Sequence, residues 1–309
     1  MKKKIILNKE LKIFEKQFIF FLKSKILFLN KIKNYFFLKK GKYVRPILIF
    51  LITKMLGTIS KKTYKLASII ELIHTASIIH DDVIDNSSFR RGFLTINSLC
   101  NNKIAVIFGD YIFSKSLNLA LNQNYNHLFS NLILKMSEGE LYQIDFIKNN
   151  KFSEKNYKKI IFNKTALLIS TCCEQSGKLL KKKHTFFFLK KIGILIGLSF
   201  QIKDDLLDYN TKNFFLKLNE TKITLPFIYS LNKASLKEKK LIFNLSKKNF
   251  LFCYKQLINF IFFLGGIEFS IYKMKLFTNK ALIQLNNFTN NSANKSLKTL
   301  IFFFINRNF

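Results

Sequence analysis

The stretch ELIHTASIIHDDVIDNSSFRRG, residues 71–92, decides how this 309-residue sequence is interpreted. Apolar side chains lead into it at helical spacing, so they form one face of a predicted helix. This face is made of Leu66, Ile69, Ile70 and Ile73, with Ser77 continuing the stripe. The stretch then carries Asp81, Asp82 and Asp85. Because Asp81 and Asp85 are four residues apart, a helix brings their carboxylates to one face, about 6 Å from each other.

A second acidic window of the same pattern lies in LSFQIKDDLLDY, residues 198–209, and again follows apolar residues at helical spacing. The two windows hold six of the eight aspartates in the chain. A single acidic helix face is usually only solvated, but two copies in a chain this poor in aspartate favour a metal site. Ligand sets made only of oxygen suit Mg²⁺, which keeps water and shares its shell with substrate phosphates.

The composition is strongly basic, with 52 Lys and Arg against 18 Asp and Glu and a formal net charge of +34. Hydrophobic residues make up 49% of the chain, which excludes a disordered basic tail. Only four of the cations are arginine, whereas nucleic-acid binders favour arginine for phosphate and guanine contacts. We attribute much of the charge to A+T-rich codons and expect no specific nucleic-acid partner. A nucleic-acid or membrane-surface protein remains an alternative supported by net charge alone.

The pattern along the chain predicts an all-α protein. Helical periodicity is common, and the hairpin dipeptides Asn-Gly and Asp-Gly are absent from the sequence. No repeat or interdomain linker is visible, so we expect one domain. Residues 250–272 are expected to form one buried helix, and no uninterrupted apolar run is long enough for a transmembrane segment. Whether the tail beyond Asn286 packs as a last helix or frays is left open by the sequence.

The cysteines and the first residues bear on location. Cys100, Cys172, Cys173 and Cys253 show no metal-binding spacing and no disulfide framework. Charged residues interrupt the apolar run near the start after three residues, unlike a secretory signal. We therefore expect a cytoplasmic protein with reduced thiols.

Cations accompany the acidic windows. Arg90 and Arg91 follow the first window, and GKYVRP, residues 41–46, supplies Lys42 and Arg45. Guanidinium groups hold phosphate oxygens with two hydrogen bonds at once. His74 precedes Asp81 by two helical turns on the same face, so we interpret it as a ligand-binding residue. His80 lies off that face and is interpreted as structural.

With these residues the sequence resembles the trans-isoprenyl diphosphate synthases, most closely the bacterial long-chain octaprenyl type. The resemblance covers about residues 40–231 and is carried by GKYVRP, IELIHTASIIHDDVIDNSSFRRG, FGDYIFSKS, SEGE, NKTALL, FQIKDDLLDY and NETKITLP. It implies one all-α helical bundle of the isoprenoid-synthase type over residues 1–309, with further helices over 232–309. In that family the two acidic motifs face each other across a central cavity, and members are usually homodimers.

The resemblance also implies residue roles. Isopentenyl diphosphate would be held by Lys42, Arg45, His74 and Arg91. The allylic diphosphate would be contacted by Arg90, Lys164, Thr165, Gln201 and Lys222. Two to three Mg²⁺ ions would be bound by Asp81, Asp85 and Asp204, with support from Asp82, Asp205 and Asp208. The residues closest to the chemistry would be Asp81, Asp85, Asp204, Lys164 and Arg90.

The implied reaction condenses isopentenyl diphosphate with a farnesyl-type allylic diphosphate. The product would be a long all-trans polyprenyl diphosphate, octaprenyl-like, which partitions to the membrane and supplies quinone side chains. Small residues favour this length, because short-chain members place bulky aromatic residues at the positions of Ala76 and Ser77. Ala120 would line the deeper part of the product tunnel.

Two departures from the family pattern bear on activity, and two alternatives stay open. Lys40 stands where a glycine is usual, and NTKNFFLKLNET, residues 210–221, lacks the usual Gly-Lys and Gly-Asp-Asp-Leu elements. Lys212 or Lys217 could replace the missing lysine. One alternative is a short-chain farnesyl or geranylgeranyl diphosphate synthase. Another is a weakly active or non-catalytic subunit that binds prenyl diphosphates.

Overall fold

The structure is a computed structural model. It describes residues 7–38, 41–90, 92–121, 126–149, 152–181, 184–209, 224–240 and 251–307. Arg91 and Lys222, both predicted to bind a diphosphate, lie outside the described residues, as do Lys212 and Lys217.

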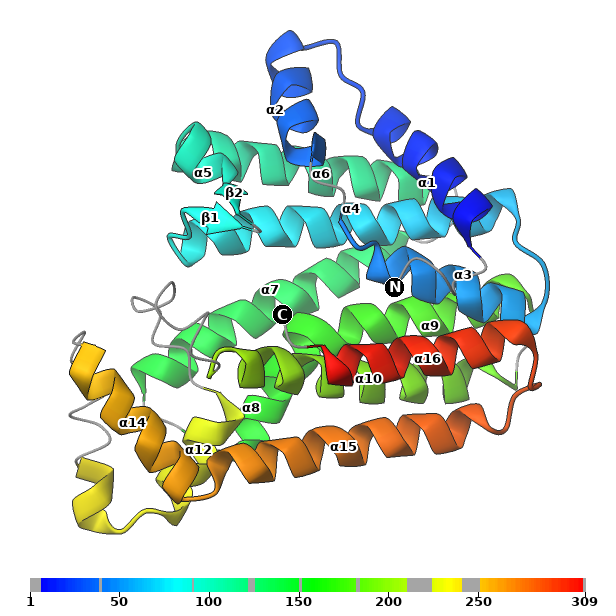
Figure 1. The fold of residues 1–309 in the computed structure, drawn as a ribbon. Helices are drawn as coiled ribbons and strands as arrows, with labels where there is room; N and C mark the ends of the chain where they lie inside the picture. Colours follow the sequence, from blue (N-terminus) through cyan, green and yellow to red (C-terminus); the bar gives the residue numbers. More distant parts are fainter. Residues whose placement is uncertain are drawn as a thin grey trace. The chain divides into compact units, whose positions relative to one another are not determined.

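The all-α prediction is confirmed, because helices make up nearly all regular structure of the described residues (Figure 1). The helices of the first half are α1 Asn8–Phe21, α2 Leu27–Leu38, α3 Val44–Leu56, α4 Lys61–Ile84, α5 Ile96–Leu99, α6 Asn102–Leu121 and α7 Asn126–Lys148. Those of the second half are α8 Glu154–Ile161, η1 Phe162–Ala166, α9 Leu167–Leu179, α10 Phe186–Leu207, α12 Leu225–Lys233, α14 Leu251–Phe263, α15 Gly266–Leu285 and α16 Ser292–Asn306.

One small hairpin departs from the sequence prediction. Strands β1, Phe89–Arg90, and β2, Phe93–Leu94, pair antiparallel directly after α4. Gly92, at the turn between them, has a φ of 78°, which glycine adopts at little cost. Two-residue strands are too short to show an alternating pattern, so they could not be predicted from the sequence.

The chain divides into two compact units, each built from segments far apart in the sequence. The first unit contains residues 1–134, 171–189 and 289–297, and the second contains residues 135–170, 190–288 and 298–309. The first acidic window belongs to the first unit and the second window to the second. A single domain over residues 1–309 stays a prediction.

Helix α4 is the central element of the first unit and packs mainly along α6, with α3 and α1 also in contact with it (Figure 1). The apolar stripe predicted for α4 is confirmed. Leu66, Ile69, Ile70 and Ile73 are all 0–1% exposed. The residues between them, Ala67, Ser68, Glu71 and Leu72, are buried as well, so this stretch of α4 is enclosed on all sides.

His80 and Gly109 explain how closely α4 and α6 can approach. A side chain on Gly109 would place its Cβ 2.2 Å from His80 Nε2. That nitrogen lies 3.2 Å from the Val106 carbonyl oxygen and 3.4 Å from Asp110 Oδ1. The His80 ring also packs on Phe113 at 5.5 Å between centroids. His80 thus ties α4 to α6, as its interpretation as a structural residue requires.

The second unit joins α8, η1 and α10 to α12, α14 and α15. The expectation of one helix over residues 250–272 is wrong, because α14 ends at Phe263 and α15 starts at Gly266 after a 60° bend. Gly265 has a φ of 75°, and a Cβ on Gly266 would lie 2.4 Å from the Pro226 carbonyl oxygen. Two glycines therefore allow the bend and the close contact with α12.

The question left open for the tail is answered by α16. Its apolar side chains are buried, with Leu297, Leu300, Ile301 and Phe304 at 0–3% exposure. The segment therefore packs as a helix instead of fraying.

One described helix, α6, is long and apolar enough for a membrane span by length and composition, although no membrane is part of the structure. A third of its most apolar window, 33%, is buried. The bent pair of α14 and α15 meets the same criterion only when taken as one segment. The absence of a transmembrane segment stays a prediction.

Replacing Gly109 by alanine tests the contact between α4 and α6. Gly109→Ala is expected to lower the free energy of unfolding by about 1–3 kcal/mol, because the new methyl group overlaps the His80 ring. The cost should fall clearly when the same change is made in a His80→Ala background. Urea denaturation of the four proteins of this double-mutant cycle measures the coupling. Additive effects would show that the contact does not limit the approach of the helices.

Candidate functional site

The first acidic window ends α4 with two outward carboxylates and one inward carboxylate. Asp81 is half-buried and Asp85 is exposed, whereas Asp82 is 4% exposed. The Asp85 backbone N–H donates to the Asp81 carbonyl oxygen at 2.8 Å, so the last turn remains helical. Asp81 and Asp85 therefore lie on successive turns of α4, as predicted.

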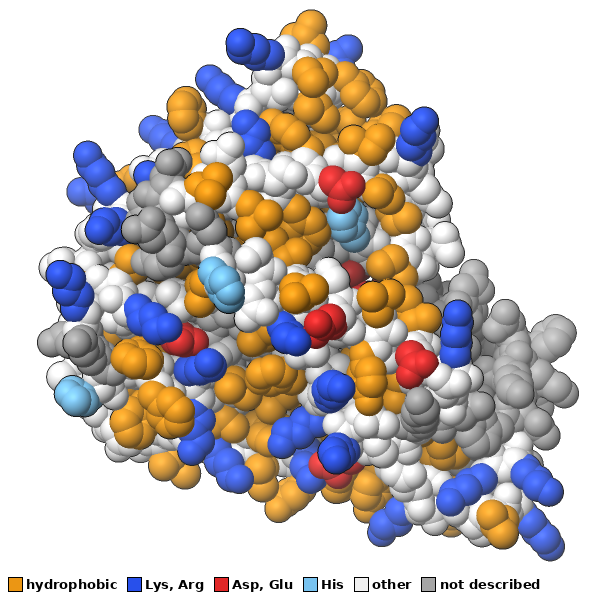
Figure 2. All heavy atoms as spheres, turned by 180° about the vertical axis from the view of Figure 1, so that it is seen from behind, with side chains coloured by type: hydrophobic (Ala, Val, Ile, Leu, Met, Phe, Trp, Pro, Cys, Tyr) orange, Lys and Arg blue, Asp and Glu red, His pale blue; other side chains and the backbone are white. Residues whose placement is uncertain are grey.

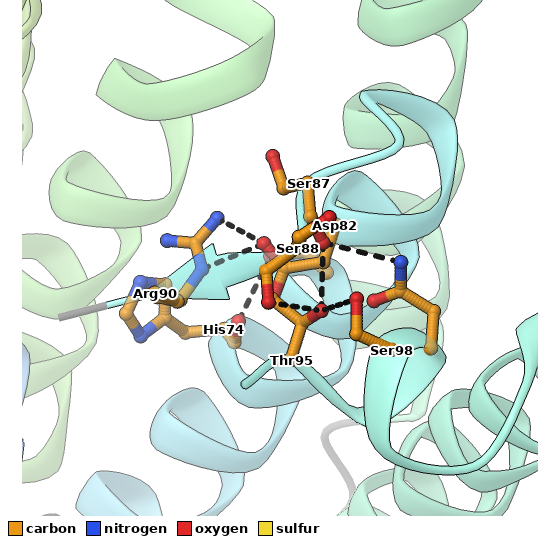
Figure 3. Close-up of polar contacts among 9 residues, drawn as sticks. His74, Asp82, Ser87, Ser88, Arg90, Thr95 and Ser98 are labelled. Atoms are coloured by element: carbon orange, nitrogen blue, oxygen red, sulfur yellow. Dashed lines mark hydrogen bonds and ion pairs between the residues drawn. The ribbon is translucent and has the colours of Figure 1, made fainter. Parts of the chain in front are cut away.

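The inward carboxylate, Asp82, is paired with Arg90. Arg90 Nε and Nη2 each lie 2.7 Å from Asp82 Oδ1 (Figure 3). Burial raises the pKa of Asp82, and the hydrogen bond and charge of Arg90 oppose that rise. The pair therefore fixes the Arg90 guanidinium beside the carboxylates at the end of α4.

The turn after α4 returns the chain so that Arg90 can reach back. Asn86 has a φ of 49°, in the left-handed region that asparagine tolerates better than most residues. The Ser87 N–H donates to the Asp82 carbonyl oxygen at 2.9 Å. Thr95 Oγ1 donates to the Ser87 carbonyl oxygen at 2.6 Å (Figure 3). Asn97 Nδ2 donates to the same oxygen at 3.2 Å. This network brings the β1–β2 hairpin against α4.

Lys42 and Arg45 flank an unusual backbone position at the start of α3. Tyr43 has a φ of 46°, a left-handed conformation that costs a residue with a bulky side chain some strain. Its ring packs edge-on against Phe14 and Phe18, at 5.3 and 6.4 Å between centroids. Helix α1 thereby holds the turn that presents exposed Lys42 and half-buried Arg45.

His74 lies half-buried on α4, with Nδ1 3.7 Å from Glu71 Oε1. Burial raises the pKa values of Tyr43 and Cys172, and the charge of Glu71 adds to the rise at both, after that of Glu15 at Tyr43. Arg45 opposes the rise at Cys172, whose pKa reaches about 12. His74 and Arg45 thus both belong to the surroundings of Glu71 and Cys172 in the first unit.

The second acidic window centres on a buried carboxylate as well. Asp205 is 2% exposed and accepts hydrogen bonds on both oxygens. Tyr157 OH donates to Oδ2 at 2.7 Å, and Gln201 Nε2 donates to Oδ1 at 3.0 Å. Thr165 Oγ1 donates in turn to Gln201 Oε1 at 2.6 Å. Burial and the neighbouring Asp205 raise the pKa of Tyr157, so its hydroxyl stays a donor.

A π-helical turn, η1, carries Lys164 and Thr165 into this network. Such turns are rare and often occur at functional sites. Lys164 Nζ lies 2.7 Å from Glu140 Oε2. A Cβ on Gly139 would lie 2.6 Å from Asn163 Cβ, and one on Gly197 would lie 2.4 Å from Ala166 Cα. Glycines on α7 and α10 therefore let both helices pack closely against η1.

A pocket in the second unit brings several predicted residues together. Lys164, Gln201 and Asp205 line it beside Tyr157, and apolar side chains of α7 and α8 complete the wall. Asp208 is half-buried at the end of α10, and its N–H donates to the Asp205 carbonyl oxygen at 3.2 Å.

The first aspartate of the second window, Asp204, is paired with an arginine that the sequence analysis missed. Arg307, which follows α16, forms an ion pair with Asp204. Its Nη2 also donates to the Phe200 carbonyl oxygen at 3.2 Å, and its guanidinium stacks 4.1 Å from the Phe200 ring centroid. Arg307 is one of only four arginines in the chain. This scarcity was the sequence signal that could have marked it as a candidate site residue.

The residues predicted to set product length are largely buried. Ala76 on α4 and Ala120 on α6 are both 0% exposed, and Ser77 is half-buried. Ser77 Oγ donates to the His74 carbonyl oxygen at 2.9 Å.

The carboxylates of the first window fit a metal ion that is bound together with a phosphate. Among the described residues, no three His, Cys, Asp or Glu side chains gather closely enough to hold an ion alone. Asp81 and Asp85 offer carboxylates from one helical face, and Mg²⁺ commonly completes such a set with water and phosphate oxygens. Because Asp82 and Asp205 are buried and hydrogen-bonded, they suit a supporting role better than direct ligation.

Comparison with known proteins decides the family. The family model described as polyprenyl synthetase matches residues 27–256. Octaprenyl diphosphate synthase of Escherichia coli is 31% identical over 235 residues, which cover 72% of each chain. Heptaprenyl diphosphate synthase component 2 of Bacillus subtilis is 32% identical over 84% of this chain and 77% of its own.

The chain belongs to the polyprenyl synthetase family. It is accordingly a trans-prenyltransferase that acts on isoprenyl diphosphates. The relatives include a geranylgeranyl and a decaprenyl diphosphate synthase, so family membership leaves the product length undetermined.

Solved structures agree with this assignment. The heptaprenyl diphosphate synthase of Staphylococcus aureus matches with a TM-score of 0.90 at 30% identity, covering 99% of this chain and all of the other. A polyprenyl synthase of Caulobacter crescentus, complexed with calcium and isoprenyl diphosphate, has the same fold with a TM-score of 0.90 at 23% identity. The polyprenyl synthetase fold is thus present over nearly the whole chain.

The ion pair between Arg307 and Asp204 can be tested by stability. Arg307→Ala is expected to lower the free energy of unfolding by about 1–3 kcal/mol, because it removes a charged hydrogen bond and leaves Asp204 facing fewer donors. Arg307→Lys should recover only part of the loss, since lysine lacks the planar fork. Lys298→Ala, which removes an exposed contact of the preceding helix α16, should change stability by less than about 0.5 kcal/mol. Equal losses in Arg307→Ala and Lys298→Ala would contradict the assignment.

Proposed function

We propose that this polyprenyl synthetase is a Mg²⁺-dependent enzyme that makes a long all-trans polyprenyl diphosphate, octaprenyl-like, from isopentenyl diphosphate and a farnesyl-type allylic primer. The observation that carries this proposal is the Asp82–Arg90 pair, which holds a guanidinium beside the outward carboxylates Asp81 and Asp85. A site of this kind offers oxygen ligands to a cation and a donor fork to a phosphate at the same place.

In the first unit, Asp81 and Asp85 would hold Mg²⁺ on the allylic diphosphate while Arg90 donates to its oxygens. Bound Mg²⁺ supplies charge neutralisation for the departing diphosphate. Lys42, Arg45, His74 and Arg91 are proposed to hold isopentenyl diphosphate. The fixed turn at Tyr43 supports this role, because it presents Lys42 and Arg45 from a defined backbone position.

In the second unit, Lys164, Thr165, Gln201 and Lys222 are proposed to contact the allylic diphosphate, and Asp204 to hold a further Mg²⁺. The hydrogen bonds from Thr165 to Gln201 and from Gln201 to Asp205 orient these side chains before substrate arrives. Asp82, Asp205 and Asp208 would support the Mg²⁺ ions indirectly, through neighbouring side chains or water.

The chemistry requires charge control and exclusion of water. Loss of diphosphate from the allylic carbon leaves a resonance-stabilised cation, which the double bond of isopentenyl diphosphate attacks. A proton is then lost from the neighbouring carbon, and the released diphosphate is the proposed acceptor. The lysine and arginine side chains proposed to contact diphosphate would stabilise the charge that develops on the leaving oxygen. Apolar walls keep out water that would otherwise quench the cation.

The assembly and location are also proposals. We infer a homodimer formed through α5 and α6, because Leu99, Val106, Ile107 and Leu121 are 40–56% exposed along these two helices.

We place the enzyme in the cytoplasm, with a product that enters the membrane and supplies quinone side chains. The free thiols of Cys100, Cys172 and Cys173 suit a reducing compartment.

A second candidate is a subunit that needs a partner for full activity. Asp204, a proposed metal ligand, is engaged by Arg307. The Bacillus subtilis relative is itself named as one component of a heptaprenyl diphosphate synthase. In this candidate the chain binds prenyl diphosphates, and chain elongation depends on another protein.

Incubating the purified protein with Mg²⁺, farnesyl diphosphate and labelled isopentenyl diphosphate distinguishes the two candidates. Long extractable product from the chain alone supports the leading proposal. Product restricted to C20 chains, or C15 product formed only when geranyl diphosphate is the primer, would support a short-chain synthase instead. No product with any divalent metal, together with retained binding of farnesyl diphosphate, would favour the partner-dependent subunit. Asp81→Asn is expected to lower the rate at least about a hundredfold, because it weakens the proposed cation site.

Product length is tested at Ala76. Ala76→Tyr is expected to shorten the extracted prenyl chains, because the ring would block a tunnel running along α4. Ala67→Tyr is the matched control, since Ala67 is also 0% exposed on α4 but lies on the opposite face. This control should destabilise the protein by about 1–3 kcal/mol without a specific change in chain length. Unchanged product length from a folded Ala76→Tyr enzyme would refute the tunnel assignment.

A further inference from the structure

The connection between α1 and α2 exposes an unusual concentration of large apolar side chains. Within ten residues, Ile19, Phe20, Ile26, Leu27 and Phe28 are 43–78% exposed. We call these five residues, with the exposed Lys23 and Lys25 between them, the α1–α2 apex. The apex lies at the top of the view in Figure 1, and orange and blue side chains are mixed there in Figure 2. Clustered exposed apolar residues usually mark an interaction surface.

The apex is ordered and presents these side chains from a defined turn. The Asn30 side chain closes that turn, because Nδ2 donates to the Ser24 carbonyl oxygen at 2.7 Å and Oδ1 accepts from the Ser24 N–H at 3.4 Å. The Ile26 N–H donates to Ser24 Oγ at 3.1 Å. Leu22, at 2% exposure, anchors the turn to the core. The outward direction of Phe20 and Leu27 is therefore built into the fold.

The charge around the apex selects the partner. From Lys16 to Lys42, both included, the sequence holds eight lysines and no aspartate or glutamate. A+T-rich codons explain many lysines and phenylalanines, but they do not explain why five large apolar side chains stay outside the core at one turn. Apolar residues flanked by lysines fit the interface of an anionic bilayer, where the rings enter the acyl boundary and the ammonium groups contact lipid phosphates.

We propose that the α1–α2 apex docks this enzyme peripherally on anionic membranes. The contact buries the tips of Phe20, Ile26, Leu27 and Phe28 while Lys23 and Lys25 pair with lipid headgroups. Docking would keep the enzyme at the surface into which a long prenyl product partitions. The proposal does not require a particular product length, and vesicle binding can be measured without any substrate.

The chain contains no tryptophan, so a single introduced tryptophan reports only on its own position. We would compare Leu27→Trp, in the apex, with Leu236→Trp, a control that is 81% exposed and next to Lys237. With vesicles of phosphatidylglycerol and phosphatidylcholine, Leu27→Trp emission should shift to the blue and be quenched by brominated lipid. Leu236→Trp emission should stay unchanged, and phosphatidylcholine vesicles alone should give a weak response at both positions.

Two results would overturn the proposal in this experiment. The first is an unchanged Leu27→Trp spectrum, or an equal response from Leu236→Trp, which would indicate only adhesion through net charge. The second is a blue shift that grows with protein concentration in the absence of vesicles. That result would assign the apex to a contact with a second copy of the chain.

Charge and apolar substitutions provide the second measurement. Phe20→Glu/Leu27→Glu and Lys23→Glu/Lys25→Glu are each expected to weaken co-sedimentation with anionic vesicles at least about tenfold. Leu236→Glu should leave it unchanged. All these side chains are exposed, so circular dichroism should show an unaltered fold. Prenyl transfer measured in detergent should also be unaltered, which separates loss of docking from loss of catalysis. Undiminished vesicle binding by both double variants would overturn the proposal.

Discussion

A carboxylate buried behind each acidic window imposes the main constraint on this structure. In the pattern Asp-Asp-x-x-Asp, the second aspartate points about 100° away from the other two around the helix. Asp82 and Asp205 are thereby turned into the protein, at 4% and 2% exposure. A buried carboxylate needs hydrogen-bond donors. Asp82 accepts from Arg90, which follows its window, and Asp205 accepts from Tyr157 of α8 and from Gln201, one helical turn before it.

These donors connect the acidic windows to the elements around them. Asp82 requires Arg90, so the chain must turn sharply at Asn86 and return as the β1–β2 hairpin. Asp205 requires Tyr157 of α8 and Gln201 of α10, which in turn holds Thr165 of the π-helical turn η1. Arg90 and Gln201, both proposed to contact substrate, are thus also groups that satisfy the buried carboxylates. Positioning and stability are coupled at both windows.

The sequence predicted those parts of the structure that depend on the helical spacing of apolar residues and on the clustering of the few aspartates. The apolar stripe through Leu66 and Ile73 predicted the helix α4, and the concentration of aspartate marked both acidic windows. Features that depend on close contact between distant segments could not be predicted. The bend at Gly265, the π-helical turn at η1 and the His80–Gly109 contact arise from tertiary packing, which leaves little trace in local periodicity. Arg307 was missed because it lies 103 residues from Asp204 and outside any acidic or basic motif.

The net charge of +34 has two components with different physical meaning. Lysines scattered over solvated helix faces reflect composition and carry little information about partners. The lysines of the α1–α2 apex differ because they flank apolar side chains that an ordered turn holds in solvent. Leaving Leu27 at 78% exposure forgoes burial that a core position would provide, at roughly 25 cal/mol for each Å². At the apex, five neighbouring apolar side chains stay in solvent, and the charges around them are all positive. A partner that offers both an apolar environment and negative charge best explains this surface.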